Sequence, residues 1–255
     1  MVRSEALPEV ALIRPDWPAP ANVRAASTTR RGGVSTGAWA RFNLGHGSGD
    51  DPQAVAENRR RLREALGLET EPAWLKQVHG ERVVDAAALA GPVAADASLS
   101  RTPGRVCAVL TADCLPVLLC DRAGTVVAAA HAGWRGLACG VLRTTVEAMA
   151  VAPYQLLAWL GPAIGSEAFE VGPEVRAVFL KQDADHADDF RPGTGDRWLA
   201  DIYALARRQL ATLGVTAVHG GERCTVSEPA WFFSYRRDGA GGGRMASLVW
   251  LDPAR

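Results

Sequence analysis

The sequence predicts an α+β protein with a single domain. Apolar, β-branched runs that are typical of buried strands cluster along the chain, as in 106–111, 117–120 and 125–130. Segments with helical periodicity stand singly between these clusters, so the regular strand–helix alternation of a doubly wound sheet is missing. No linker or repeat divides the sequence. We therefore expect one domain over 22–255, preceded by an irregular lead-in over 1–21.

Capping residues and hydrophobic periodicity place the individual elements. Asp51 and Pro52 predict a helix start, and Gly67 predicts its end. The segment 86–104, rich in Ala, Gly and Pro, is predicted as a long loop, and the polar segment 181–197 as a surface excursion. The predicted strands are 23–29, 74–78, 106–111, 117–120, 125–130, 156–160, 215–219, 231–237 and 247–251, and further helices are predicted over 135–149, from Pro173, and over 199–213.

The composition restricts the partners that we expect. Lys+Arg and Asp+Glu each number 28 in 255 residues, which does not suit a nucleic-acid-binding or polybasic membrane surface. No apolar stretch approaches the roughly 20 residues of a membrane span, and no N-terminal signal is recognisable. The five scattered cysteines fit reduced thiols better than a disulfide framework. We expect a cytoplasmic monomer that acts on small molecules.

The stretch 128–136 joins a predicted strand to a predicted helix through a tight turn at Ala132 and Gly133. His131 is therefore held rigidly at a strand end. Free N–H groups at the helix start favour an anion nearby. Such a histidine either faces a cleft or is buried with a hydrogen-bond partner, and this stretch alone leaves both interpretations open.

Three residues share this position, where a predicted strand gives way to a turn with Gly or Pro: His79, Cys114 and His131. Two imidazoles and a thiolate suit a zinc ion, and a fourth coordination position would remain open, as catalytic sites require. Water bound to such a zinc ion titrates near pH ~7. The spacing alone is a weak signal, because only the fold can bring residues so far apart together.

The same residues allow a second chemistry. Cys114 could act as a nucleophile with His131 or His79 as its base, and Asp113 or Gln77 could orient that base. A metal site and a Cys–His pair use the same atoms. The residues by themselves therefore leave both possibilities open.

Several longer motifs resemble one known family across nearly the whole chain. The sequence is similar to the YfiH-type family, also called the laccase-domain, polyphenol oxidase or peptidoglycan editing factor family. Its members are described as zinc-binding purine nucleoside phosphorylases. The motifs are 28–33 (TTRRGG), 43–45 (NLG), 77–80 (QVHG), 111–116 (TADCLP), 131–136 (HAGWRG), 161–165 (GPAIG) and 232–238 (FFSYRRD).

This resemblance implies a four-layer α/β/β/α fold, with two mixed β-sheets packed face to face and helices outside. It also implies zinc at His79, Cys114 and His131. The implied reactions are phosphorolysis of adenosine, inosine and methylthioadenosine, and deamination of adenosine. We expect Arg30 and Asn43 at motif positions that contact substrate or phosphate. The remaining candidates are Asp113 for proton transfer, and Gln77 and Arg135 for substrate binding.

Three other functions are weighed against this interpretation. A hydrolase that edits peptidoglycan precursors could use the zinc-bound water or Cys114. A polyphenol oxidase would need several Cu²⁺ centres, yet only two of the five histidines lie in the matched ligand motifs. A binding protein with a structural zinc would usually supply four ligands. Zinc is therefore favoured over copper, and an enzyme over a binding protein.

Overall fold

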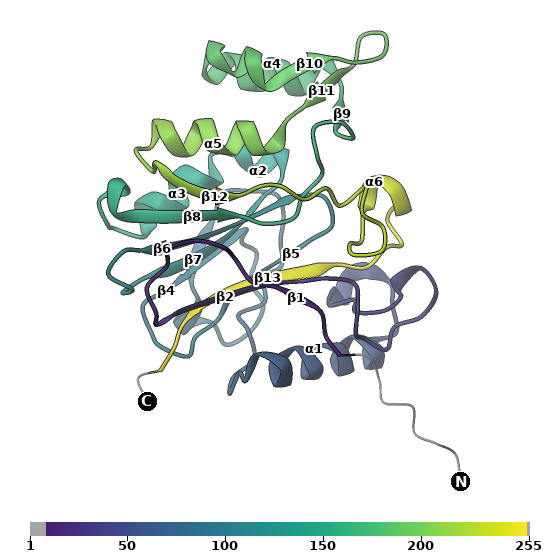
Figure 1. The fold of residues 1–255 in the computed structure, drawn as a ribbon, viewed down its shortest axis with the longest axis vertical. Coiled ribbons are helices and arrows are strands. Elements are labelled where there is room, and N and C mark those ends of the chain that lie inside the picture. The colour runs from purple at the N-terminus through teal and green to yellow at the C-terminus, as the bar shows by residue number, and fades with distance from the viewer. Residues whose placement is uncertain (1–8, 254–255) are drawn as a thin grey trace.

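Two β-sheets lie face to face in the computed structural model, which describes residues 9–253 (Figure 1). One sheet has four antiparallel strands in the order β1-β2-β13-β5, and the other has six strands in the order β12-β8-β6-β7-β4-β3. The larger sheet is mixed, because β12 pairs parallel with β8 and β3 parallel with β4. The strands are β1 (Leu12–Ile13), β2 (Val23–Thr28), β3 (Val83–Asp85), β4 (Ala97–Ser100), β5 (Cys107–Thr111), β6 (Leu115–Asp121), β7 (Val127–Ala132), β8 (Leu156–Leu160), β12 (Ala217–Gly220) and β13 (Met245–Leu251).

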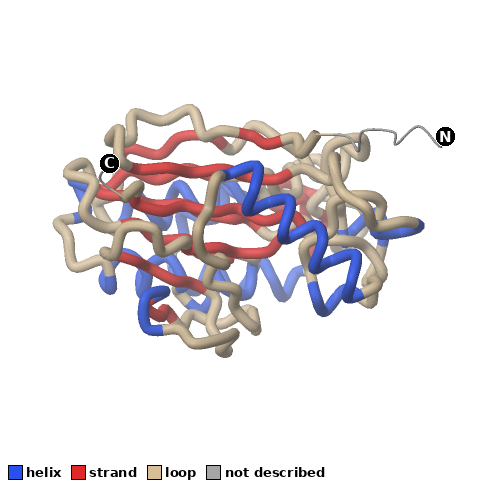
Figure 2. The backbone as a smooth tube through the Cα atoms, turned by 90° about the horizontal axis from the view of Figure 1, so that it is seen from below, coloured by secondary structure: helices blue, strands red, loops and turns tan. Residues whose placement is uncertain are grey.

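Helices cover the outer face of each sheet, so the expected α+β fold of four layers is confirmed. Figure 2 shows α1 (Pro52–Leu66) crossing the strands of the sheet that it covers. Asp51 caps α1 by accepting a hydrogen bond from the Gln53 N–H, and Gly67 ends it with φ of 63°, as the sequence predicts. The other helices are α2 (Trp134–Cys139), α3 (Val141–Ala148), α4 (Pro173–Gln182), α5 (Ile202–Thr212) and the short α6 (Tyr235–Asp238).

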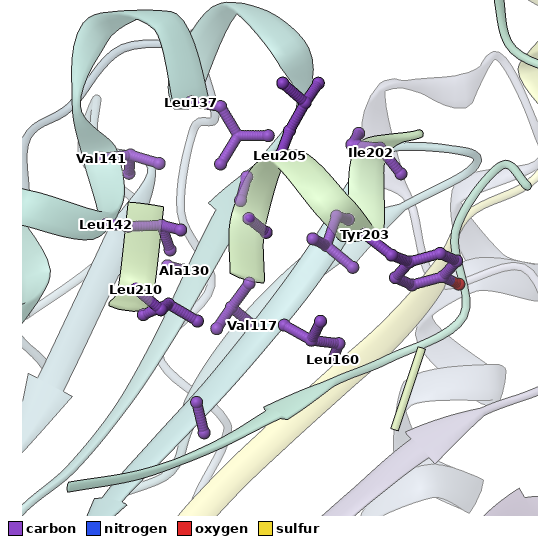
Figure 3. Close-up of a cluster of buried hydrophobic side chains, with 14 of the residues drawn as sticks. Val117, Ala130, Leu137, Val141, Leu142, Leu160, Ile202, Tyr203, Leu205 and Leu210 are labelled. Atoms are coloured by element: carbon purple, nitrogen blue, oxygen red, sulfur yellow. The ribbon is translucent and has the colours of Figure 1, made fainter. Parts of the chain in front are cut away.

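The central strand β6 is buried on both faces, which explains its continuous apolar run. Alternate side chains point to opposite faces: Val117 packs under the helices, whereas Leu118 packs between the sheets. Figure 3 shows the helix-side cluster, in which Leu205 and Leu210 of α5 lie over the strands. A small third sheet, β9 (Glu170–Val171), β10 (Phe190–Pro192) and β11 (Trp198–Ala200), lies beyond α5 near α4 (Figure 1).

Three element predictions are wrong, and long-range pairing explains two of them. Residues 74–78 form no strand and only one isolated bridge, at Lys76, because the Gln77 side chain binds both backbone groups of Leu110. The predicted loop 86–104 contains β4, whose small side chains gave no strand signal but fit the buried space between β7 and β3. Residues 231–237 form a turn and the start of α6, which Ser234 caps, instead of a strand.

Two further differences concern boundaries. The predicted helix 135–149 is two helices, α2 and α3, which meet at Gly140 with φ of 94°. The lead-in contains β1, and Trp17 and Ala19 pack against the core between the sheets, while residues 1–8 lie outside the described part. Over the residues that the structure describes, no helix has the length and apolar character needed to cross a membrane.

Candidate metal centre and cleft

A cleft of about 840 Å³ opens where the β5–β6 turn meets the β7–α2 turn. Both turns lie at one end of the paired sheets, and loops from distant parts of the chain complete the walls. The polar and charged residues that line the cleft are His46, Ser48, Arg59, Lys76, Gln77, His79, Thr111, Asp113, Cys114, His131, Arg135, Tyr235, Arg236 and Arg244.

The cleft contains the three residues that the sequence singled out as metal ligands. One ligand atom from each of His79, Cys114 and His131 lies within 4.8 Å of the other two, so the group could hold a metal ion. The Cys114 Sγ is 4.0 Å from His79 Nε2. Strand register explains part of this convergence, since β6 begins directly after Cys114 and pairs Pro116 with His131.

Asp96, which lies in the segment predicted as a loop, organises two of the three candidate ligands. Its carboxylate accepts a hydrogen bond of 2.8 Å from His131 Nδ1, which leaves Nε2 as the ring nitrogen available to a metal. The same carboxylate accepts the backbone N–H groups of Val78, His79 and Gly80. Asp96 is fully buried, and its position just before β4 brings it beside His131 on β7.

The backbone around this cluster is tight and locally strained. A Cβ atom on Gly133 would lie 2.7 Å from Cys114 Sγ, so only glycine leaves room for the sulfur. His79 and Asp113 adopt φ of 61° and 86°, which non-glycine residues rarely do. The three hydrogen bonds from 78–80 to Asp96 hold the His79 conformation in place.

Without metal, the cluster favours a thiolate beside an imidazolium. Burial opposes ionisation of Cys114, but attraction to His131 and His79 and hydrogen bonds with both rings outweigh it and lower the pKa of the thiol to about 6. Burial likewise opposes the charged form of His131, while Cys114 and the bond to Asp96 raise its pKa to about 9. The thiol is thus prepared for the deprotonated form in which cysteine binds metal.

Positive charge and aromatic rings make up much of the remaining wall. The cationic lining residues are Arg59, Lys76, Arg135, Arg236 and Arg244, and the aromatic ones are Trp74, Trp134, Phe169 and Tyr235. Asp113 is the carboxylate among the lining residues. This lining suits a ligand that combines a flat ring with an anionic group.

Asp113 and Gln77 lie in the cleft wall with their polar atoms already engaged. Asp113 accepts hydrogen bonds from Thr225, Ser234 and the Arg236 N–H, and these tie the β5–β6 turn to α6. Gln77 binds both backbone groups of Leu110. These contacts hold the backbone next to the candidate ligands Cys114 and His79, and they give no support to proton transfer by Asp113.

Arg30 and Asn43, expected at substrate-contacting positions, are not among the residues that line the cleft. The Arg30 guanidinium donates to the carbonyl oxygens of Ala40 and Pro229. Asn43 is fully buried and binds Ser48 and Asp50 through its amide nitrogen. Arg30 and Asn43 therefore support loops. Arg135, by contrast, lies in the cleft wall, with its guanidinium carbon 4.4 Å from the centroid of the Trp134 ring.

Comparison with known proteins identifies the family of this chain. A family model described as multi-copper polyphenol oxidoreductase laccase matches residues 24–252. The chain belongs to this laccase-like, YfiH-type family. The YfiH-type chain is 57% identical over 244 residues to the purine nucleoside phosphorylase YfiH of Escherichia coli, covering 94% of this chain and 98% of the relative. It is also 57% identical over 242 residues to a purine nucleoside phosphorylase of Pseudomonas aeruginosa, covering 94% and 98%.

Solved structures show the same fold as the YfiH-type chain. Protein NMB0706 of Neisseria meningitidis superposes with a TM-score of 0.91 at 55% identity, covering 94% of this chain and 99% of that protein. YlmD of Geobacillus stearothermophilus superposes with a TM-score of 0.87 at 31% identity, covering 94% and 96%. The fold that positions the His79, Cys114 and His131 group is therefore a property of the family.

Proposed function

We propose that this chain is a zinc-dependent purine nucleoside phosphorylase that also deaminates adenosine. The observation that carries the proposal is the convergence of His79, Cys114 and His131 in a cleft lined by arginines and aromatic rings. The names of the similar proteins, purine nucleoside phosphorylases, support the phosphorolysis part. The five free cysteines support a reducing compartment, and hence the cytoplasm, as the place of action.

The donor set fits zinc. Two imidazoles and a thiolate are zinc ligands, and the Asp96 bond to His131 is the outer partner that metal-bound histidines usually have. A two-histidine, one-cysteine set also suits a single copper ion with an axial methionine, but no methionine is among the residues that line the cleft. A copper relay would need further histidine clusters, and residues 9–253 offer a single group of this kind.

The chain's own residues would bind and orient the nucleoside. When bound, zinc supplies a Lewis acid and lowers the pKa of coordinated water to near ~7. Trp134 and Tyr235 offer aromatic faces to a purine ring, and the cationic wall attracts phosphate. Asp96 holds His131 in one tautomer, and Gly133 leaves space for the Cys114 sulfur.

The test is an incubation of zinc-loaded protein with adenosine, in the presence and absence of phosphate. We expect adenine and ribose 1-phosphate only with phosphate, and inosine under both conditions. Inosine and methylthioadenosine as substrates should yield hypoxanthine and adenine. If the loaded protein forms none of these products, the proposal is refuted. Release of an amino acid from a peptidoglycan precursor would instead favour the editing hydrolase.

A further inference from the structure

Two of the cationic residues in the cleft wall, Arg59 and Arg244, differ from the rest in being largely buried. Arg59 on α1 keeps only 9% of its surface exposed, and Arg244 precedes β13 in a half-buried position. By contrast, Arg135 and Arg236 are exposed. A buried guanidinium is costly unless an anion or hydrogen-bond acceptors compensate it, so these two arginines need an explanation.

Neither arginine has a carboxylate partner within 4.0 Å among the described residues. Arg59 donates Nε and Nη2 to the Leu44 carbonyl oxygen, and Arg244 donates Nη1 to the carbonyl oxygens of Gly242 and Gly243. Glu71 acts on Arg59 only from a longer distance, because it is engaged by Trp74 and Arg63. Each guanidinium thus keeps further N–H groups for a ligand.

The two arginines border the same loop, 43–48. Arg59 binds the carbonyl of Leu44, and a Cβ on Gly45 would lie 2.7 Å from the Arg244 Cγ. The Asn43 side chain fixes this loop, because its Oδ1 accepts the N–H groups of both Gly45 and Arg244. Both arginines are therefore held against the same turn, and together with it they line the cleft.

Electrostatics relates this pair of arginines to the metal centre. Burial lowers the pKa of Arg59 to about 10, although Glu71 acts in the opposite direction and the guanidinium carbon lies 4.1 Å from the centroid of the Trp74 ring. Burial also lowers the pKa of Arg244, while the charges of Cys114 and Asp113 act in the opposite direction. Arg244 therefore lies within electrostatic range of Cys114, one of the three candidate ligands. An anion bound by the two arginines would occupy the same cleft as a ligand bound at the candidate metal group.

We propose that Arg59 and Arg244, both packed against the 43–48 loop in the cleft wall, form the subsite for inorganic phosphate. The proposal rests on the proposed phosphorylase function and gives its second substrate a place in the cleft. A planar fork from each arginine can bind two phosphate oxygens. Neither arginine is paired with a carboxylate within 4.0 Å in residues 9–253, so no such pair has to be broken. The motif match had suggested Arg30 as the phosphate-binding residue. The present proposal assigns that role to two arginines that line the cleft.

The test measures binding of inorganic phosphate by calorimetry to the zinc-loaded wild type and to R59Q and R244Q. Loss of one charge-assisted fork should weaken phosphate binding roughly tenfold to a hundredfold. R59K keeps the charge but not the fork, so it should fall between the wild type and R59Q; it also covers the case in which R59Q fails to fold. The matched control is R60Q, next in sequence on α1, whose exposed side chain pairs with Glu57 and Glu64.

The outcomes test the phosphate subsite separately from the proposed phosphorylase function. Unchanged phosphate binding in R59K and R244Q, or absent binding in the wild type, would overturn the subsite. Binding of adenosine monophosphate without binding of inorganic phosphate would also overturn it, because the site would then belong to a nucleotide. Phosphate binding that depends on both arginines, together with a wild type that forms no ribose 1-phosphate, would support the subsite and refute the phosphorylase function.

Discussion

Two parts of the cleft wall are held in different ways. At the candidate metal group, the buried carboxylate of Asp96 binds His131 and the backbone on either side of His79, and Gly133 leaves room for the Cys114 sulfur. At the arginine pair, backbone carbonyl oxygens bind the side chains of Arg59 and Arg244. The metal group depends on one carboxylate and one glycine, whereas each arginine is held by more than one hydrogen bond. We expect small changes to be most damaging at the metal group.

The largest effect is expected from Cys114→Ala. Removing a direct ligand should cost more than the roughly 10- to 100-fold loss of metal affinity that outer partners cause, and activity should fall with it. Elemental analysis and the adenosine assay measure the two losses in the same preparation. Cys139→Ala, at an exposed cysteine, is the matched control.

A different result would change the chemistry assigned to Cys114. The lowered pKa of its thiol also suits a nucleophile. If activity disappears while zinc remains bound at full occupancy, the sulfur acts as a nucleophile and the ligand assignment is wrong. Circular dichroism should show that the variant is folded.

Asp96→Asn should have the next largest effect. An amide NH₂ would face the N–H groups of Val78 or Gly80, which the carboxylate now accepts. We expect a loss of metal affinity of about 10- to 100-fold and a fall in the unfolding free energy of the metal-free protein by roughly 1–3 kcal/mol. Asp188→Asn, at an exposed position, is the control. Unaltered zinc affinity would show that Asp96 does not position the ligands.

Gly133→Ala tests the packing around Cys114 without removing any polar group. The added methyl group would lie 2.7 Å from Cys114 Sγ, so the sulfur must shift. Overpacking of this kind costs about 1–3 kcal/mol, and we expect zinc affinity to fall about tenfold. Gly91→Ala is the control, since a Cβ there meets nothing within 4 Å. Equal zinc titration curves for both variants would contradict the role of Gly133.

Local signals predicted the parts of the molecule that depend on near neighbours. The caps of α1 at Asp51 and Gly67 and the buried strand β8 follow from composition and periodicity. The candidate ligands His79, Cys114 and His131 could be singled out because each lies where a predicted strand gives way to a turn, although the strand predicted before His79 does not form. The motif match also supported them. Their convergence, however, depends on the register between β6 and β7, which no local pattern gives.

The residues that sequence reasoning missed act across long separations. Asp96 lies in a segment rich in small residues, and its partner His131 is 35 positions away. Arg59 looks like any arginine of an amphipathic helix until α1 is placed against the loop at Leu44. A buried charge can be recognised only when its surroundings are known. The one available signal was the lone carboxylate of Asp96 directly before four small or apolar residues.

The smallest effect on activity is expected from Arg30→Gln, which compares the two arginine environments directly. Arg30 binds the Ala40 carbonyl through two nitrogens and stacks on Phe233, outside the cleft lining. Loss of these contacts should lower the unfolding free energy by about 1–3 kcal/mol. The KM for phosphate should change less than about twofold, since no transition-state or substrate contact is removed.

Chemical denaturation and phosphate titration of Arg30→Gln, measured beside Arg244→Gln, provide the comparison. If Arg30→Gln raises the KM for phosphate as much as Arg244→Gln does, the loop at Arg30 must reach the substrate. The contrast between an arginine that supports a loop and an arginine that binds a ligand would then fail. Both arginines are anchored by backbone carbonyl oxygens, but only Arg244 lines the cleft. If only Arg244→Gln raises the KM for phosphate, access to the cleft is what distinguishes an arginine that binds phosphate from one that supports a loop.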